Sequence, residues 1–101
     1  MEQKQTSSIS FCVRRLKALA DTHRWAVIDM LQDGSKTVGE LIDRLGLEQS
    51  LLSHHLKILR DEGLIVSMRE GKRVRYRLAN GVALSSSGRG INLGCCRLEM
   101  N

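Results

Sequence analysis

A short polar segment in the middle of the chain carries side chains that suit contact with nucleic-acid bases. Within QSLLSHHLK (49–57) these residues are Gln49, Ser50, Ser53, His54 and Lys57. Gln can form two hydrogen bonds to an adenine edge, Ser both donates and accepts, and Lys pairs with phosphate. The segment is therefore a candidate for contact with a DNA groove, and a solvated helix face is the alternative interpretation.

A run of cations follows closely in SMREGKRVRYRL (67–78). The candidate phosphate contacts are Arg69, Lys72, Arg73 and Arg75, and one Arg at the tip could enter a minor groove. Residues 49–78 hold seven basic and three acidic side chains, so they supply four of the chain's net +5 charges. The cations gather on one side and are not interleaved with acids. This favours the interpretation that the hairpin binds an anionic partner over the interpretation that its charges are only solvated.

Two adjacent thiols near the end of the sequence, Cys95 and Cys96, form the third candidate site. Trivalent arsenic and antimony are soft and prefer sulfur ligands, so neighbouring thiolates suit them. A third sulfur is then needed, either from Cys12 or from residues beyond Asn101. Cys12 also fits a small packed residue on an apolar helix stripe, and Cys95 and Cys96 could be incidental thiols on a tail.

Apolar periodicity predicts the elements that position these residues. Helices are expected over 9–20, from Asp21 or Thr22 to 33, over 37–46 and over 48–61, and strands over 64–69 and 72–78 around a Glu70-Gly71 turn. In the fourth helix Leu52, Leu56 and Leu59 share one side with His55, which is expected to be packed. The fold class is mainly α with a β-hairpin (α+β), a winged helix-turn-helix. Residues 1–8 are expected to be a flexible arm and 9–80 the winged helix-turn-helix DNA-binding domain. Residues 81–101 are expected to be a C-terminal segment that carries the cysteine pair and is a candidate sensor and dimer contact.

Length and composition further limit the class of protein to which the chain can belong. A chain of 101 residues with 42% hydrophobic and 27% charged residues fits one globular domain. Three aromatic residues argue against base stacking as the binding mode. No apolar run reaches the roughly 18 residues that span a bilayer, and MEQKQTSS lacks the order of a secretory signal. We expect a cytoplasmic protein without a membrane contact, whose three cysteines are reduced thiols.

Four segments carry a resemblance to a known family. These are ALADTHRWAVIDML, TVGELIDRLGL, QSLLSHHLKILRDEGL and REGKRVRYRL, which together resemble the ArsR/SmtB winged-helix repressors over Leu16 to Leu78. The resemblance implies a homodimer on an inverted-repeat operator, released when a ligand binds. It places Gln49, Ser50, Ser53, His54 and Lys57 on the recognition helix and Arg73 and Arg75 in the wing.

Two departures from the family pattern bear on the ligand. Thr37-Val38-Gly39 stands where many metalloid sensors carry Cys-Val-Cys, and no His follows His55 to build the zinc site of the last helix. We therefore expect a repressor that leaves double-stranded DNA when As(III) or Sb(III) binds Cys95 and Cys96. The alternatives are a repressor responding to thiol oxidation or persulfide formation and, less favoured, a basic module that binds an acidic protein. An enzyme with a catalytic cofactor is not expected, because no nucleophile–base pair, phosphate loop or paired-acid site is present.

Overall fold

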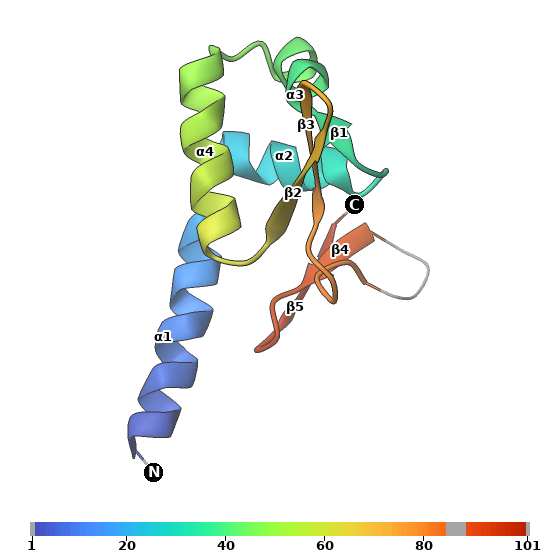
Figure 1. Ribbon diagram of the computed structural model, residues 1–101. Coiled ribbons are helices and arrows are strands. Elements are labelled where there is room, and N and C mark those ends of the chain that lie inside the picture. The colour runs from blue at the N-terminus through green and yellow to red at the C-terminus, as the bar shows by residue number, and fades with distance from the viewer. Residues whose placement is uncertain (1, 85–88, 101) are drawn as a thin grey trace.

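The computed structural model describes residues 2–84 and 89–100, with side chains over 9–84 and 89–99. The elements run in the order α1 (Glu2–Leu19), α2 (Thr22–Leu31), β1 (Lys36–Thr37), α3 (Val38–Leu45), α4 (Gln49–Asp61), β2 (Ile65–Glu70), β3 (Arg73–Leu78), β4 (Arg89–Asn92) and β5 (Arg97–Met100). Helices α3 and α4 are joined by a short turn, and β2 and β3 form the wing (Figure 1). The predicted winged helix-turn-helix is confirmed.

Local capping chemistry fixes where the middle helices begin and end. Asp21 caps α2, its Oδ1 accepting hydrogen bonds from the backbone N–H of His23 at 2.9 Å and of Arg24 at 3.1 Å. Thr37 and Glu40 form a reciprocal capping box at the start of α3. Gly46 ends α3 at a φ of 67°, a left-handed conformation that favours glycine. The turn between α3 and α4 therefore lies where the sequence predicted it, around Gly46.

The three-stranded sheet has the order β1-β3-β2, with antiparallel pairing throughout. Glu70 pairs with Arg73, so the wing turn is Gly71-Lys72, one residue later than the predicted Glu70-Gly71. Gly71 has a φ of 59°, which glycine adopts without a Cβ clash, and it therefore takes the first turn position. Tyr76 and Leu78 on β3 are buried, as the alternating pattern predicts.

The core forms where the apolar side of α4 meets α2 and the sheet. Leu52 and Leu59 of α4 are 0% exposed, as are Val27 and Ile28 of α2. His55, on the same side of α4, is 5% exposed. Burial of this side leaves the opposite side of α4 to solvent, and that side carries the predicted base contacts.

Both ends of the chain differ from expectation. Residues 2–8, predicted as a flexible arm, are helical and continue α1, and their sequence contains no Pro or Gly to end a helix. Residues 89–100, expected to belong to a segment separate from the DNA-binding domain, form the hairpin β4–β5. Ile91 of β4 and Leu93 of its turn lie in the same core at 0% exposure. Among the described residues, no helix combines the length and apolarity needed to cross a membrane.

Truncating a buried leucine of α4 should destabilise the protein much more than truncating an exposed leucine of the same helix. Leu59→Ala should lower the free energy of unfolding by about 2–5 kcal/mol, because it leaves a cavity in the core. Leu51→Ala is the matched control on the same helix; Leu51 is 40% exposed, and its truncation should cost under about 1 kcal/mol. Urea denaturation followed by circular dichroism measures both. Equal losses for the two variants would contradict this packing of α4.

Candidate nucleic-acid interface and thiol cluster

The predicted base contacts all lie on the solvent side of α4. Gln49, Ser50, Ser53, His54 and Lys57 are exposed, while the buried leucines occupy the other side of the helix. The first turn also lacks a side-chain cap, since the side chain of Glu48 makes no capping hydrogen bond. Uncapped backbone N–H groups at a helix start attract phosphate.

An open groove of about 600 Å³ connects the start of α4 with the wing. Gln49 lines it together with Lys72 and Arg73 of the wing and with Thr37 to Glu40 and Ile42-Asp43 around the start of α3. In Figure 1 the start of α4, α3 and the tip of the wing lie at the same end of the molecule. The polar end of the helix and the basic ribbon therefore border one concave surface.

The cations of this surface differ in their pairing. Among the ion pairs of the described residues, none involves Arg69, Lys72 or Arg73, and all three side chains are exposed. Lys57 Nζ lies 2.8 Å from Asp61 Oδ2, an exposed pair one helical turn apart that phosphate can replace.

Arg75 is held within the fold, unlike Arg69, Lys72 and Arg73. Its Nε lies 3.3 Å from Glu70 Oε1, and its Nη1 donates to Ser35 Oγ at 3.3 Å. The side chain is 27% exposed. Arg75 is thus the least available of the predicted phosphate contacts, because binding DNA would require it to give up these partners.

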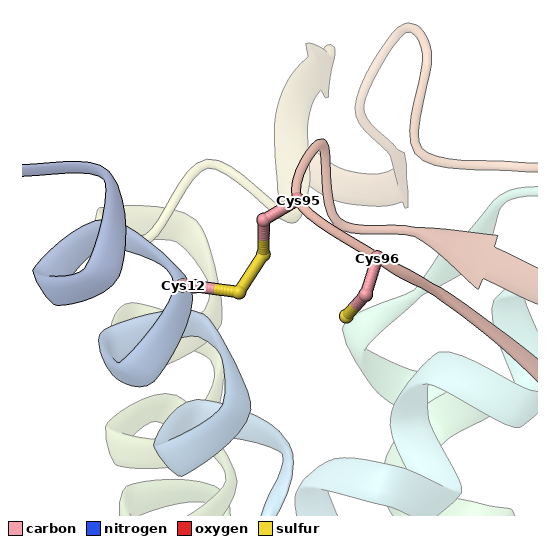
Figure 2. Close-up of side chains that lie close together, drawn as sticks. All are labelled: Cys12, Cys95 and Cys96. Carbon is pink, nitrogen blue, oxygen red and sulfur yellow. A yellow bond between two sulfur atoms is a disulfide. The ribbon is translucent and has the colours of Figure 1, made fainter. Parts of the chain in front are cut away.

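The three cysteines lie together, although their redox state differs from expectation. Cys12 of α1 and Cys95 form a disulfide across a sequence separation of 83 residues, with Cα atoms 6.0 Å apart (Figure 2). Cys96 keeps a free thiol, and the three sulfur atoms lie within 4.8 Å of one another. The expectation of three reduced thiols is therefore wrong for Cys12 and Cys95, because folding brings their Cα atoms to a separation that disulfides span.

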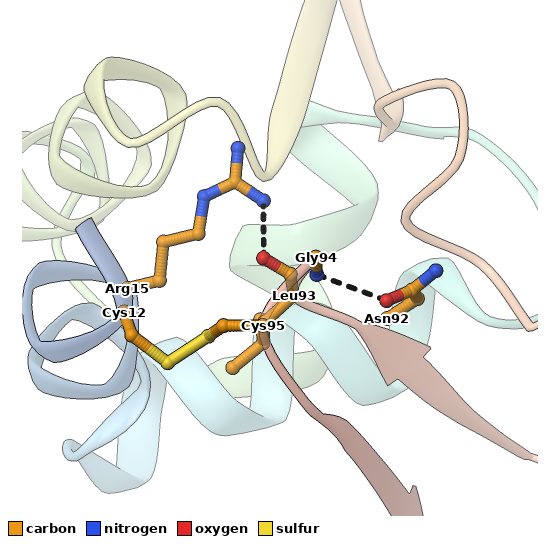
Figure 3. The surroundings of a disulfide bond; sticks show 6 residues. All are labelled: Cys12, Arg15, Asn92, Leu93, Gly94 and Cys95. Carbon is orange, nitrogen blue, oxygen red and sulfur yellow. Dashed lines mark hydrogen bonds between the residues drawn. A yellow bond between two sulfur atoms is a disulfide. The ribbon is translucent and has the colours of Figure 1, made fainter. Parts of the chain in front are cut away.

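A tight turn docked on α1 builds this cluster (Figure 3). Arg15 Nη1 donates to the Leu93 carbonyl oxygen at 3.2 Å, and the Asn92 side chain accepts a hydrogen bond from Gly94 N at 2.9 Å. The Arg15 guanidinium also stacks over the Phe11 ring, 4.3 Å from its centroid. Sequence reasoning missed Arg15; its place one helical turn after Cys12 was the available signal.

A second cluster of potential metal ligands, formed by Asp21, His23 and His55, is a structural contact between helices. The Arg24 guanidinium lies 3.1 Å from His55 Nδ1 and donates through Nε to the Ala18 carbonyl at 2.6 Å. A cation is therefore already beside the imidazole, which disfavours a metal ion there. Burial lowers the pKa of His55, so its neutral form is favoured. The cluster joins the α1–α2 corner to α4.

Helix, short turn, polar helix and basic hairpin together define a winged helix-turn-helix domain. A family model described as bacterial regulatory protein, arsR family, matches residues 21–67. The chain is 40% identical over 78 residues to the transcriptional activator HlyU of Vibrio cholerae, covering 77% of this chain and 72% of that protein. The chain belongs to the ArsR family.

Other relatives agree with this assignment. The chain is 43% identical over 65 residues to the transcriptional repressor SmtB of Mycobacterium tuberculosis, covering 64% of this chain and 48% of that protein. The solution structure of a homodimeric winged helix-turn-helix DNA-binding domain from Mycobacterium bovis matches with a TM-score of 0.73 at 30% identity, covering 76% of this chain and 71% of that chain. The chain spans about half the length of the first curated relatives it matches. These relatives are transcriptional regulators and not enzymes.

The buried imidazole predicts a stability that falls in mild acid. The pKa of His55 is lowered in the fold, so below the ordinary His value of about 6.5 the unfolded chain binds more protons than the folded one. The free energy of unfolding should therefore decrease as pH falls from 7.5 to 5.5, by at most about 1.4 kcal/mol per pH unit. The pKa of Asp21 is also lowered, chiefly by the backbone hydrogen bond from Arg24, so its contribution is lost only at lower pH.

Urea denaturation of wild type and His55→Gln at several pH values measures this effect. In the variant the free energy of unfolding should no longer fall with pH between 7.5 and 5.5, whatever its value at pH 7.5. A wild-type free energy of unfolding that does not change across this range would contradict the lowered pKa of His55.

Proposed function

We propose that the chain is a homodimeric transcriptional repressor that binds an inverted-repeat operator and leaves it when As(III) or Sb(III) binds cysteine thiolates. The observation that carries the ligand assignment is the gathering of Cys12, Cys95 and Cys96, with sulfur atoms within 4.8 Å of one another. Three soft thiolates suit a trivalent metalloid. Cys12 then supplies the third sulfur, once its disulfide with Cys95 has been reduced.

Binding to duplex DNA is supported by the groove between α4 and the wing. In this proposal Gln49, Ser50, Ser53 and His54 face base edges, and Lys57, Arg69, Lys72 and Arg73 neutralise phosphates. Arg75 contributes mainly by joining β3 to Glu70 of β2 within the wing and to Ser35, which precedes β1. Phosphate contacts give affinity and steer the approach, and the short polar side chains supply the sequence preference.

Dimer formation is supported by the unburied apolar face of α1. Ile9, Val13 and Leu16 are 64%, 41% and 40% exposed and follow one side of the helix. A second copy would cover this face, and the Mycobacterium bovis relative is described as homodimeric. Cys12 precedes Val13 on the same helix, so a change at the sulfur cluster acts directly on the element that carries the dimer contact.

A second candidate keeps the repressor and makes oxidation the signal. The disulfide between Cys12 and Cys95 favours it specifically, because the bond ties α1 to the β4–β5 hairpin. In this version the oxidised and reduced proteins differ in DNA affinity without any metalloid. Measuring operator affinity before and after treatment with a phosphine reductant separates the two candidates.

Removing one wing cation should lower DNA affinity and its salt dependence together. Arg73→Ala should reduce the slope of log K against log salt concentration by about 1, since each phosphate contact releases about one counterion. Lys17→Ala is the charge-matched control, as Lys17 is exposed on α1 away from the groove. Fluorescence anisotropy with a labelled inverted repeat over a range of salt concentrations provides the measurement. Binding that shows no preference for any inverted repeat would support the alternative of a basic module for acidic proteins.

Loss of one thiol should uncouple the ligand from DNA release. Cys96→Ser and Cys12→Ser should bind the operator as wild type does, but the As(III) concentration for half-release should rise at least about tenfold, a loss of about 1.4 kcal/mol of binding free energy. An operator gel shift under a phosphine reductant, with As(III), Sb(III), Zn(II) and Cd(II) titrated in turn, tests this. Unchanged release in Cys96→Ser would remove this thiol from the mechanism.

A further inference from the structure

A free thiol lies directly beside the disulfide of the cluster. Cys96 is unbonded, and its sulfur lies within 4.8 Å of the sulfur atoms of Cys12 and Cys95 (Figure 2). Disulfides exchange when a thiolate attacks one sulfur and the other sulfur leaves as a thiolate. We propose that the cluster is a thiol–disulfide exchange centre, in which Cys96 displaces Cys95 from Cys12 and makes Cys95 an accessible site for modification by low-molecular-weight disulfides and soft electrophiles.

The exchange is balanced within the chain. The Cys96 thiol loses its proton to solvent, and its sulfur attacks the Cys12 sulfur. The Cys12–Cys96 bond forms as the Cys12–Cys95 bond breaks, and Cys95 leaves as a thiolate that solvent protonates. One disulfide and one thiol are present before and after, so no oxidant or reductant is consumed.

Chain geometry decides which sulfur is attacked. Attack on Cys95 would join two adjacent residues, whose Cα atoms are about 3.8 Å apart across a trans peptide. Disulfides usually span Cα separations of roughly 4.4–6.8 Å, so this product would be strained. Attack on Cys12 instead joins α1 to the docked turn, as the existing bond does with a Cα separation of 6.0 Å.

The two disulfide forms differ in the exposure of the remaining thiol. With Cys12 bonded to Cys95, the free thiol is Cys96, which is half-buried and packs against the core. After exchange the free thiol is Cys95, whose side chain is exposed at the tip of the turn. A disulfide RSSR then gives a mixed disulfide, Cys95–S–SR, and releases RS⁻, which is the same exchange with an external partner.

The regulatory meaning of this chemistry rests on the proposed function. Either disulfide form leaves one free thiolate, too few to hold a trivalent metalloid through three sulfurs. A mixed disulfide at Cys95 would keep the cluster unable to bind a metalloid until a thiol reductant cleaved the mixed disulfide. The same three residues would thus make the response to As(III) conditional on the thiol redox balance.

Thiol labelling of the full chain tests the exchange. The reduced protein is oxidised with one equivalent of diamide, the reagent is removed, and N-ethylmaleimide is added at pH 7.5 at limiting or at excess concentration. After complete blocking, reduction and a second alkylation, trypsin releases the peptide 90–97 between Arg89 and Arg97. Tandem mass spectrometry then shows which cysteine carried the maleimide.

We expect the maleimide on both Cys95 and Cys96, with the Cys95 share rising severalfold when labelling is slowed so that exchange outpaces capture. Label confined to Cys96 at every maleimide concentration would overturn the proposal. Cys95→Ser provides a second readout, since it should lose both remaining thiols through a Cys12–Cys96 bond. If this variant kept two free thiols under conditions that oxidise wild type, Cys96 would not reach Cys12 and the proposal would fail.

Cys96→Ser is the matched control, because it should hold the Cys12–Cys95 bond and take up no label after oxidation. The labelling requires neither DNA nor metalloid. A negative result therefore leaves the proposed DNA release untouched, and a failure of As(III)-driven release in the reduced protein leaves the labelling result intact.

Discussion

The docking of the turn between β4 and β5 on α1 is the interaction on which the arrangement of both chain ends depends. It joins Cys12 to Cys95 across 83 residues, and Arg15 supports it by donating to the Leu93 carbonyl. In the chain-entropy description, closing a loop of this length removes unfolded-state freedom worth about 4–5 kcal/mol. That is comparable with the whole stability of a small domain, about 5–15 kcal/mol. The redox state of one bond therefore bears on the stability of the entire fold and on where α1 points.

Burial of α4 provides the second constraint. Leu52, Leu56 and Leu59 are almost wholly removed from solvent, so the helix cannot rotate without exposing them. Its polar side consequently faces solvent, and at the start of the helix Gln49 lines the groove that Lys72 and Arg73 border. The hydrophobic core thus sets the orientation of side chains that never enter it. Contacts with Glu70 and Ser35 hold Arg75 against the fold, which leaves it less available to phosphate than Arg69, Lys72 and Arg73.

Features encoded by neighbouring residues could be predicted from the sequence. The capping box of Thr37 and Glu40, the Gly46 stop and the alternation on β3 all follow from local spacing. The Cys12–Cys95 bond could not be predicted, because no local pattern reports that two segments 83 residues apart dock. The β4–β5 hairpin fell between these cases. Its strands, RGIN and RLEM, are too short to show a clear alternation, although Ile91 of β4 and Leu93 of the following turn are both buried. Residues 2–8 were misjudged because their polarity indicated an arm, although nothing in them ends a helix.

In the proposed function, a change at the sulfur cluster must reach α4. Besides the core packing of Ala18 and Leu19, two polar connections among the described side chains join α1 to α4. The Arg14–Glu62 pair, 3.4 Å long, has an Arg side chain that is 57% exposed, and such surface pairs contribute at most about 1 kcal/mol. Arg24 is the stronger connection. It donates to the Ala18 carbonyl at the end of α1 and contacts the buried His55 on the inner side of α4. Allosteric coupling typically amounts to about 1–3 kcal/mol. The half-buried guanidinium of Arg24 bridges a helix end to a buried imidazole. The free energy lost when one of its contacts breaks falls within that range, because polar groups are then left unsatisfied. A shift of α1 would therefore act on the recognition helix through its packed side, leaving the exposed residues to respond as a unit.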